Sequence, residues 1–203
     1  LVAGDLDAQS LSFGLIPRIN VAGRLGHAGI SLDLLTAGTR EMAKPLADEL
    51  DRKNAERQRL TEQGVAAARI QIEERLASGD VPSIIIVSSP DWVPGILGLI
   101  AGRISEHYHR PAIAIEVGDE VSRASARSIP EFDIVKELAA SRDLLIKFGG
   151  HSQAAGFTVP SRLLPTLQQE LEAVADERLR GLDLKPRIEY DCELSPAVLP
   201  GEN

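Results

Sequence analysis

The segment that most constrains the fold is SIIIVSS, residues 83–89. Its unbroken run of β-branched apolar side chains predicts a strand buried on both faces, because a half-exposed strand would alternate polar and apolar residues. Such a strand needs cover on both sides of its sheet. The next segment, PGILGLIAGRISEHYH from residue 94, fits a helix with proline in its first turn. We therefore expect an α/β fold.

The rest of the chain beyond residue 110 continues to alternate strand and helix signals. Short apolar or alternating runs predict strands, and longer periodic runs predict helices. The expected class is a mixed β-sheet flanked by helices. The strands are expected at 111–117, 121–129, 154–160 and 187–194, and the helices at 132–141 and 161–181.

A long charged segment precedes the first strand. Residues 39–79 hold eight basic and eight acidic residues, with apolar residues at helical spacing. They predict one long helix, or two helices nearly end to end, starting near Thr39. Pro45 lies in the second turn and favours a later start or a kink. Residues 1–38 are rich in glycine, and we expect them to be irregular.

Composition narrows the function classes. The 203 residues carry a net charge of −8, which argues against a protein that coats nucleic acid by overall charge alone. The single cysteine, Cys192, excludes an internal disulfide and a cysteine-rich zinc site, and it suits the reducing cytoplasm. No apolar run approaches the roughly 18 residues of a membrane span. The first residue is leucine in what reads as mid-domain sequence, so we expect a fragment of a longer protein.

Four segments of this acidic chain contain basic residues and no carboxylate. They are also rich in glycine, serine or alanine, as anion sites are, because small residues expose backbone N–H groups beside arginine side chains. If they meet in space, they form a phosphate-binding groove. The segments are 12–27, 92–105, 121–130 and 144–162.

Individual motifs of the chain also have simpler interpretations when each is taken alone. GGH at 149–151 is more typical of a tight turn than of a site. SARSI at 125–129 fits close strand packing, and HYH at 107–109 fits a surface tail after a helix. No cluster of acidic residues and histidines suggests a hydrolytic metal centre, and no Ser-His-Asp or Cys-His arrangement is evident. The pattern alone predicts a phosphate-binding partner to chemistry located elsewhere.

Taken together and in this order, these segments resemble the RecJ family of single-strand-specific exonucleases. IPRINVAGRLGHA (16–28) looks like the end of the family's catalytic DHH domain. SARSI and FGGHSQAAGF (148–157) look like two motifs of its DHH-associated domain, and DWVPGILGLIAGRI (91–104) like its strand-to-helix segment. IEYDCEL (188–194) resembles the first strand of an OB-fold. The domains that the resemblance implies are the DHH end at 1–38, a connector helix at 39–79, the DHH-associated domain at 80–185 and the OB-fold start at 186–203.

The resemblance also implies roles for individual residues. His151 corresponds to a histidine that contacts the phosphate of the bound strand. The other substrate-binding positions are expected to contact the nucleic-acid backbone or to lie near the cleft. They are Asn20, Arg24, Ser125, Arg127, Ser128, Gly149 and Gly150, of which the two glycines are expected to form a loop that exposes backbone amides. The family's Mn²⁺ or Mg²⁺ ligands lie upstream of Leu1, so no metal ligand is expected in this chain.

The implied function is that of the substrate-binding lobe of a 5′-to-3′ exonuclease for single-stranded DNA in repair and recombination. A single-strand-binding protein or a helicase is a further partner that the resemblance implies. Val93 departs from the family, where many members have histidine, so that contact is not carried over. Two alternatives stay open. One is a DHH phosphodiesterase for short oligonucleotides or cyclic dinucleotides, and the other is a non-catalytic nucleic-acid-binding module.

Overall fold

The computed structural model describes residues 7–79, 81–185 and 190–193. Within these ranges, a short N-terminal helical region leads into one very long helix, and a compact sheet region follows. The helices are η1 (Ser10–Leu15), α1 (Ile16–Leu25), α2 (Gly29–Leu35), α3 (Arg40–Ala77), α4 (Pro94–Tyr108), α5 (Ile134–Ala140), η2 (Arg142–Leu144), η3 (Ser161–Leu163) and α6 (Leu164–Leu179). The strands are β1 (Ile85–Ser89), β2 (Ala112–Glu116), β3 (Val121–Arg127), β4 (Lys147–His151) and β5 (Ala154–Pro160).

The five strands form one mixed sheet in the order β1-β2-β3-β5-β4. β1 and β2 are parallel, as their connection through α4 requires. The other neighbouring pairs are antiparallel. The expected fold class, a mixed sheet flanked by helices after a long helix, is therefore confirmed.

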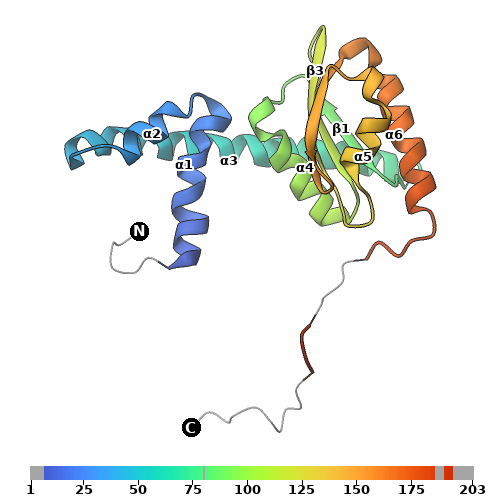
Figure 1. The fold of residues 1–203 in the computed structure, drawn as a ribbon, viewed down its shortest axis with the longest axis horizontal. Coiled ribbons are helices and arrows are strands. Elements are labelled where there is room, and N and C mark those ends of the chain that lie inside the picture. The colour runs from blue at the N-terminus through green and yellow to red at the C-terminus, as the bar shows by residue number, and fades with distance from the viewer. Residues whose placement is uncertain (1–6, 80, 186–189, 194–203) are drawn as a thin grey trace.

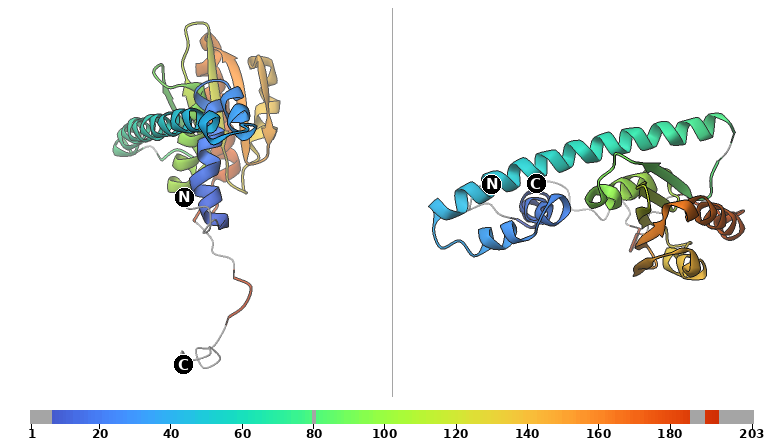
Figure 2. Two further views of the ribbon diagram at one scale, coloured as in Figure 1. Left: turned by 90° about the vertical axis from the view of Figure 1, so that its left-hand side faces the viewer. Right: turned by 90° about the horizontal axis from the view of Figure 1, so that it is seen from above.

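The helices cover the sheet unequally on its two faces. α5 and α6 pack on one face, where Ile113, Ala126 and Phe157 join the largest buried apolar cluster. On the other face, α4 lies over β2 and β3, and α3 backs α4 and packs against β1 (Figures 1 and 2). β5 and β4 extend beyond α4 on this second face. Small or polar side chains therefore remain accessible on half of one face of the sheet.

α3 is a single continuous helix that runs from the N-terminal helices to the sheet (Figure 1). The Thr39 hydroxyl accepts a hydrogen bond from the Met42 N–H at 3.3 Å, which caps its first turn. The helix continues through Pro45, so the two-helix alternative is wrong. A Cβ at Gly64 would lie 2.4 Å from the Ile100 side chain. Glycine at this position is what lets α3 and α4 pack closely.

The expectation that residues 1–38 are irregular is wrong for their described part, 7–38. The glycine-bearing segment 16–25 is helix α1, with Pro17 in its first turn. Val21 and Ala22 of α1 are fully buried against Leu50 of α3. Burial on the long helix stabilises a segment whose glycines lower its intrinsic helix propensity. The last expected strand, 187–194, lies mostly outside the described residues, and its described part, 190–193, is not in a strand.

Candidate phosphate-binding site

The strand register assembles the candidate site beside α4 and on the strands that extend beyond it. Each row crosses β2, β3, β5 and β4 in turn, and alternate residues of a strand share a face. Besides alanine, glycine, serine and threonine, these rows carry three basic residues of the four segments and His151. The rows are Ala112–Arg127–Ala154–His151, Ala114–Ser125–Gly156–Gly149 and Glu116–Arg123–Thr158–Lys147. We call the accessible part of these rows the open face; it excludes Ala112 and Ala114, which are fully buried beneath α4. Its one carboxylate, Glu116, is paired with Arg123 at 3.3 Å.

Arg127 lies against α4, and the glycines of that helix make room for it. A Cβ at Gly98 would meet the Arg127 Nη2 at 2.8 Å and the Ser125 hydroxyl oxygen at 3.1 Å. Arg127 Nη1 donates to Ser125 Oγ at 3.2 Å and to the Ala126 carbonyl at 2.8 Å. These contacts hold the guanidinium beside Ser125, with donors left over for an anion. The glycine spacing of α4 therefore positions the SARS motif.

Arg24 reaches the same place from the N-terminal helices. Its Nη1 donates to the Gly95 carbonyl at 3.3 Å, and its own carbonyl lies where a Gly95 Cβ would be. Burial, followed by the positive charge of Arg24, lowers the pKa of Arg127. Asn20 is exposed one turn before Arg24, on the same face of α1. Two segments about a hundred residues apart in sequence thus meet at the N-terminal end of α4.

The expected glycine loop is a strand. Lys147–His151 forms β4, the edge strand, which pairs antiparallel with β5 through a turn at Ser152 and Gln153. Gly150 has φ +149°, and a Cβ there would lie 2.2 Å from the Ala154 carbonyl oxygen. Glycine at Gly150 is therefore required by the hairpin itself. The prediction failed because glycine is rare in strands, whereas pairing with β5 overrides that preference here.

Gly149 and Gly156 face each other across the hairpin and differ from Gly150. A Cβ added at Gly149 would touch nothing within 4 Å, and one at Gly156 would make only an ordinary contact at 3.7 Å. Both residues are exposed, and neither has a positive φ. The packing of the described residues therefore does not require glycine at either position. Their missing side chains leave the middle of the open face free for close approach of a ligand to the backbone.

His151 stands at the end of its row, two strands from Arg127. Its Nδ1 accepts a hydrogen bond from the Gln153 N–H at 3.4 Å, and its side chain is exposed. A neutral imidazole that accepts at Nδ1 carries its proton on Nε2. Two strand spacings separate the Arg127 and His151 backbones by about 10 Å. The His151 Nε2–H is thus available as a donor on the same face of the sheet as Arg127.

Ser128 is placed differently from Ser125, its neighbour in the SARS motif. The Ser128 hydroxyl donates to the Phe132 carbonyl at 2.6 Å, and its N–H donates to the Gln153 carbonyl at 2.9 Å. Both groups thus link the end of β3 to neighbouring turns. The contact of Ser128 with a nucleic-acid backbone stays a prediction.

A hollow of about 370 Å³ lies between the first turn of α4 and the open face. Pro94 and Leu97 line it on the helix side, and Arg123, Ser125 and Lys147 on the sheet side. The amino-terminal end of a helix is the positive end of its dipole, and it attracts anions. Val93, which caps α4 by its backbone position only, is 38% exposed.

The sequence pattern missed one contributor to this region, Arg57 of α3. Burial, followed by the charges of Arg24 and Arg103, lowers the pKa of Arg57. A second hollow, of about 250 Å³, is lined by Arg57, Arg103 and Arg127. Arg57 is one of eight basic residues in a helix that balances them with eight acids, so nothing in the sequence singled it out.

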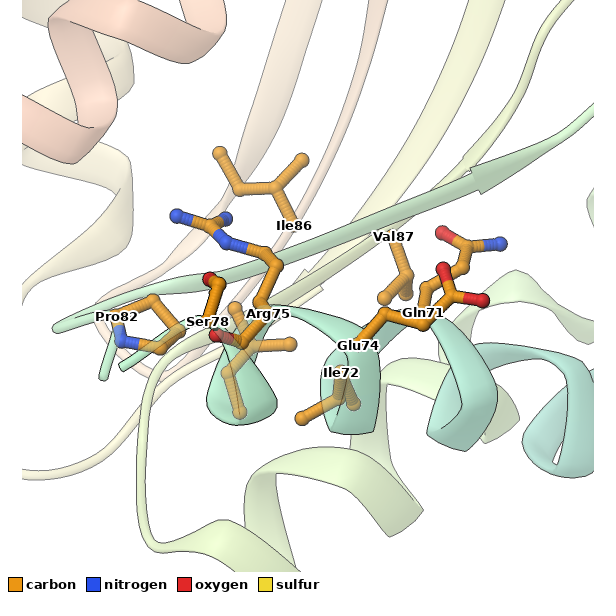
Figure 3. Close-up of a pocket in the computed structure, with 9 residues that line it drawn as sticks. Gln71, Ile72, Glu74, Arg75, Ser78, Pro82, Ile86 and Val87 are labelled. Carbon is orange, nitrogen blue, oxygen red and sulfur yellow. Dashed lines mark hydrogen bonds between the residues drawn. The ribbon is translucent and has the colours of Figure 1, made fainter. Parts of the chain in front are cut away.

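A third hollow, of about 360 Å³, lies at the opposite edge of the sheet, between the end of α3 and β1 (Figure 3). There the Gln71 side-chain amide donates to the Ser88 carbonyl at 2.9 Å and accepts from the Ser88 N–H at 3.2 Å. Arg75, which also lines it, is paired with Glu172 at 2.8 Å. Gln71 thus occupies the free edge of β1 as a strand would, and the basic segments lie elsewhere.

The described residues offer neither a metal centre nor a membrane span. No group of three or more histidine, cysteine, aspartate or glutamate side chains there is placed to hold a metal ion. None of the helices described is both long and apolar enough to cross a membrane.

Comparison with known proteins identifies both the sheet region and the chain. Residues 81–177 match the DHHA1 domain family. The single-stranded-DNA-specific exonuclease RecJ of Bacillus subtilis is 33% identical over 93% of this chain and 24% of its own length. The protein of the same name from Salmonella typhimurium is 35% identical over 97% of this chain and 35% of its own length. The chain therefore spans about a quarter to a third of these curated relatives.

Solved structures agree with the sequence relatives. The crystal structure of RecJ from Thermus thermophilus with Mg²⁺ matches 84% of this chain and 26% of its own chain, at 34% identity and a TM-score of 0.71. A crystal structure of exonuclease RecJ bound to manganese matches 88% of this chain and 44% of its own, at 32% identity and a TM-score of 0.72. Sequence and fold agree over nearly the whole chain, which belongs to the RecJ family and contains its DHHA1 domain.

Proposed function

We propose that this chain is the phosphate-binding lobe of a RecJ-like exonuclease that degrades single-stranded DNA from 5′ to 3′. The proposal extends to this chain what the names of its relatives state for them. The observation that carries it is the open face, where the strand register brings Arg127, Ser125 and His151 together. DNA repair and recombination are the processes that such an activity serves.

The open face is suited to the sugar–phosphate backbone rather than to bases. Base recognition in single strands relies on aromatic side chains for stacking, and aromatic residues make up 3% of this chain. Trp92, Phe132 and Phe157 are buried, and Phe148, which borders the hollow beside the first turn of α4, is 37% exposed. Arginine side chains, a serine hydroxyl and glycine backbone are the partners that phosphate oxygens prefer. The surface therefore favours binding that is independent of base sequence.

In catalysis the residues of this lobe would orient the strand and neutralise its charge. Arg127 and Arg24 would pair with non-bridging phosphate oxygens, and the His151 Nε2–H would donate to the same group from the other side. Donors fixed before the substrate arrives stabilise negative charge that develops on a phosphate during hydrolysis. These groups position and stabilise the phosphate, and none of them activates water in this scheme.

The metal ions in the related structures do not fit the described residues of this chain. Mg²⁺ and Mn²⁺ need several converging oxygen ligands, and no such group is present among those residues. In the intact enzyme a metal would supply the activated water and stabilise the leaving oxygen. We propose that its ligands belong to another part of the protein. We also propose that the protein acts with a single-strand-binding protein or a helicase, and that it is located in the cytoplasm.

The test is binding of a fluorescein-labelled oligo(dT) to the full chain, measured by fluorescence anisotropy at low salt. We expect measurable affinity that falls as salt rises, since phosphate contacts release counterions. The double variant Arg127→Gln, His151→Ala should bind at least about tenfold more weakly, because two donors to one phosphate are lost. Arg178→Gln is the matched control, since Arg178 lies on α6, over the opposite face of the sheet.

Two results would contradict the proposal. One is unchanged affinity of the double variant, which would remove the open face from the binding surface. The other is equal weakening by Arg178→Gln, which would show a response to overall charge only. Circular dichroism of each variant checks that the fold is intact.

A further inference from the structure

The second hollow gathers positive charge from four separate elements. Its residues come from α3, α4 and β3, and the side chain of Arg24 on α1 lies close enough to affect two of them. The four arginines concerned are Arg24, Arg57, Arg103 and Arg127. Neighbouring guanidinium groups repel each other, and an anion bound between them offsets that repulsion.

The side chain of Arg57 is held in place by a neutral group, the side-chain amide of Asn54. Its Nε and Nη2 donate to Asn54 Oδ1 at 3.2 Å and 3.0 Å. Asn54 is 6% exposed, and Thr61, one turn beyond Arg57, is 1% exposed and donates its hydroxyl to the Arg57 carbonyl at 2.7 Å. Asparagine orients the guanidinium and leaves its charge in place, whereas an aspartate would cancel that charge. The remaining donors of Arg57 are free to face the hollow.

No carboxylate neutralises this cluster within the described part of the chain. None of the ion pairs found there includes any of the four arginines. Glu106 borders the hollow but makes no ion pair with them. An arginine cluster without counter-charge lowers stability, and binding an anion relieves that cost. The arrangement therefore points to a ligand.

We propose that Arg57 and Arg103 form a second phosphate subsite, which holds an internal phosphate of the strand bound on the open face. The proposal rests on the function proposed above and extends it from one phosphate to two. Arg127 borders the second hollow and contacts Ser125, which borders the first, so the two hollows meet at one side chain. Gly98 and Gly102 place no side chain on the surface of α4 beside Arg127. A flexible backbone can thus pass from one hollow to the other.

The experiment measures oligo(dT) affinity at several salt concentrations for the full chain and for Arg57→Gln and Arg103→Gln. For single strands, each phosphate held contributes about 0.7 to the slope of log affinity against log salt. We expect each variant to reduce the slope by about 0.7, and the double variant to reduce it no further, because both residues hold one phosphate. Arg59→Gln is the matched control, since Arg59 is exposed on the same helix and contacts only Gln63 among the described hydrogen bonds.

The strand ends separate an internal phosphate from a terminal one. We expect the same loss with hydroxyl-ended, 5′-phosphorylated and 3′-phosphorylated oligo(dT). A loss confined to a phosphorylated end would overturn the internal assignment. The subsite would be overturned if the salt slopes of Arg57→Gln and Arg103→Gln were unchanged while Arg127→Gln bound oligo(dT) weakly. The proposed function would then still stand. Absence of binding by the unmodified chain would instead overturn the proposed function.

Asn54→Asp provides an independent test that keeps the shape of the site. The carboxylate would accept the same two hydrogen bonds from Arg57 while cancelling its charge. We expect the salt slope to fall as it does in Arg57→Gln, with a thermal midpoint no lower than that of the unmodified chain. A merely structural Arg57 would give an unchanged slope, which would contradict the subsite.

Discussion

The two faces of the sheet are built from the same strands and serve opposite purposes. In β5, Phe157 and Val159 lie under α5 and α6 and are almost fully buried, whereas Gly156 beside them is exposed. In β3, Ala124 and Ala126 belong to the buried face, and Arg123, Ser125 and Arg127 belong to the open face. On β3 and β5, one face is filled by apolar side chains and the other lacks large ones. The contrast shows that stability and binding can be altered separately in this domain.

The largest expected effect comes from the covered face. Phe157→Ala removes a side chain that is 4% exposed and leaves a cavity, so we expect a loss of about 4 kcal/mol in the free energy of unfolding. Urea denaturation measures it. Arg123→Gln, on the neighbouring strand and the open face, should change the same quantity by less than about 0.5 kcal/mol. Comparable losses in both variants would refute the division between the faces.

The second test separates two adjacent glycines of β4. Gly150→Ala forces a Cβ against the Ala154 backbone at a positive φ, and we expect it to destabilise the protein by about 3 kcal/mol. Gly149→Ala meets open space and should raise the free energy of unfolding by about 0.5 kcal/mol. We also expect it to weaken oligo(dT) binding. Should Gly149→Ala bind as tightly as the unmodified chain, the open middle of the face would have no role in binding.

Gly98→Ala should raise the stability of the protein and lower its affinity for oligo(dT). Alanine is favoured over glycine in a helix by about 1 kcal/mol, so α4 should become more stable. The new Cβ would displace the Arg127 guanidinium, and oligo(dT) affinity should fall. Gly102→Ala gains the same helix propensity but meets only the Arg127 Cγ, at 3.9 Å. Equal affinities in the two variants, measured by anisotropy alongside thermal melting, would argue against the positioning of Arg127 by α4.

The smallest expected effect distinguishes two serines of one motif. Ser128→Ala removes the hydrogen bond to the Phe132 carbonyl and should cost about 1 kcal/mol in thermal or urea unfolding. Ser125→Ala should lower the oligo(dT) affinity and leave stability nearly unchanged, and Ser128→Ala should lower the affinity less, because the Ser128 hydroxyl already donates to the Phe132 carbonyl. Equal falls in affinity with the two variants would contradict this difference between the serines.

Much of the fold was predictable because its signals are local. The strand expected at 154–160 is β5 with the same bounds, and Thr39 caps the long helix at the expected position. Capping, proline placement and apolar periodicity act within a few residues, so they can be read along the chain. The segment 16–25 and the strand Lys147–His151 were missed for the opposite reason. Their glycines disfavour regular structure locally, and packing on Leu50 and pairing with β5 stabilise it.

The amino-acid sequence by itself determined the fold class, the order of the elements after residue 80 apart from β4, and which segments hold basic residues without carboxylates. These depend on residue type and short-range spacing. Only the tertiary structure decided that SARS and GGH lie in registered rows on one face, that Gly150 serves the hairpin while Gly149 leaves space, and that Arg57 joins the cluster. Register, crossing helices and burial are set by contacts between residues far apart in the chain, and no short stretch of sequence records them.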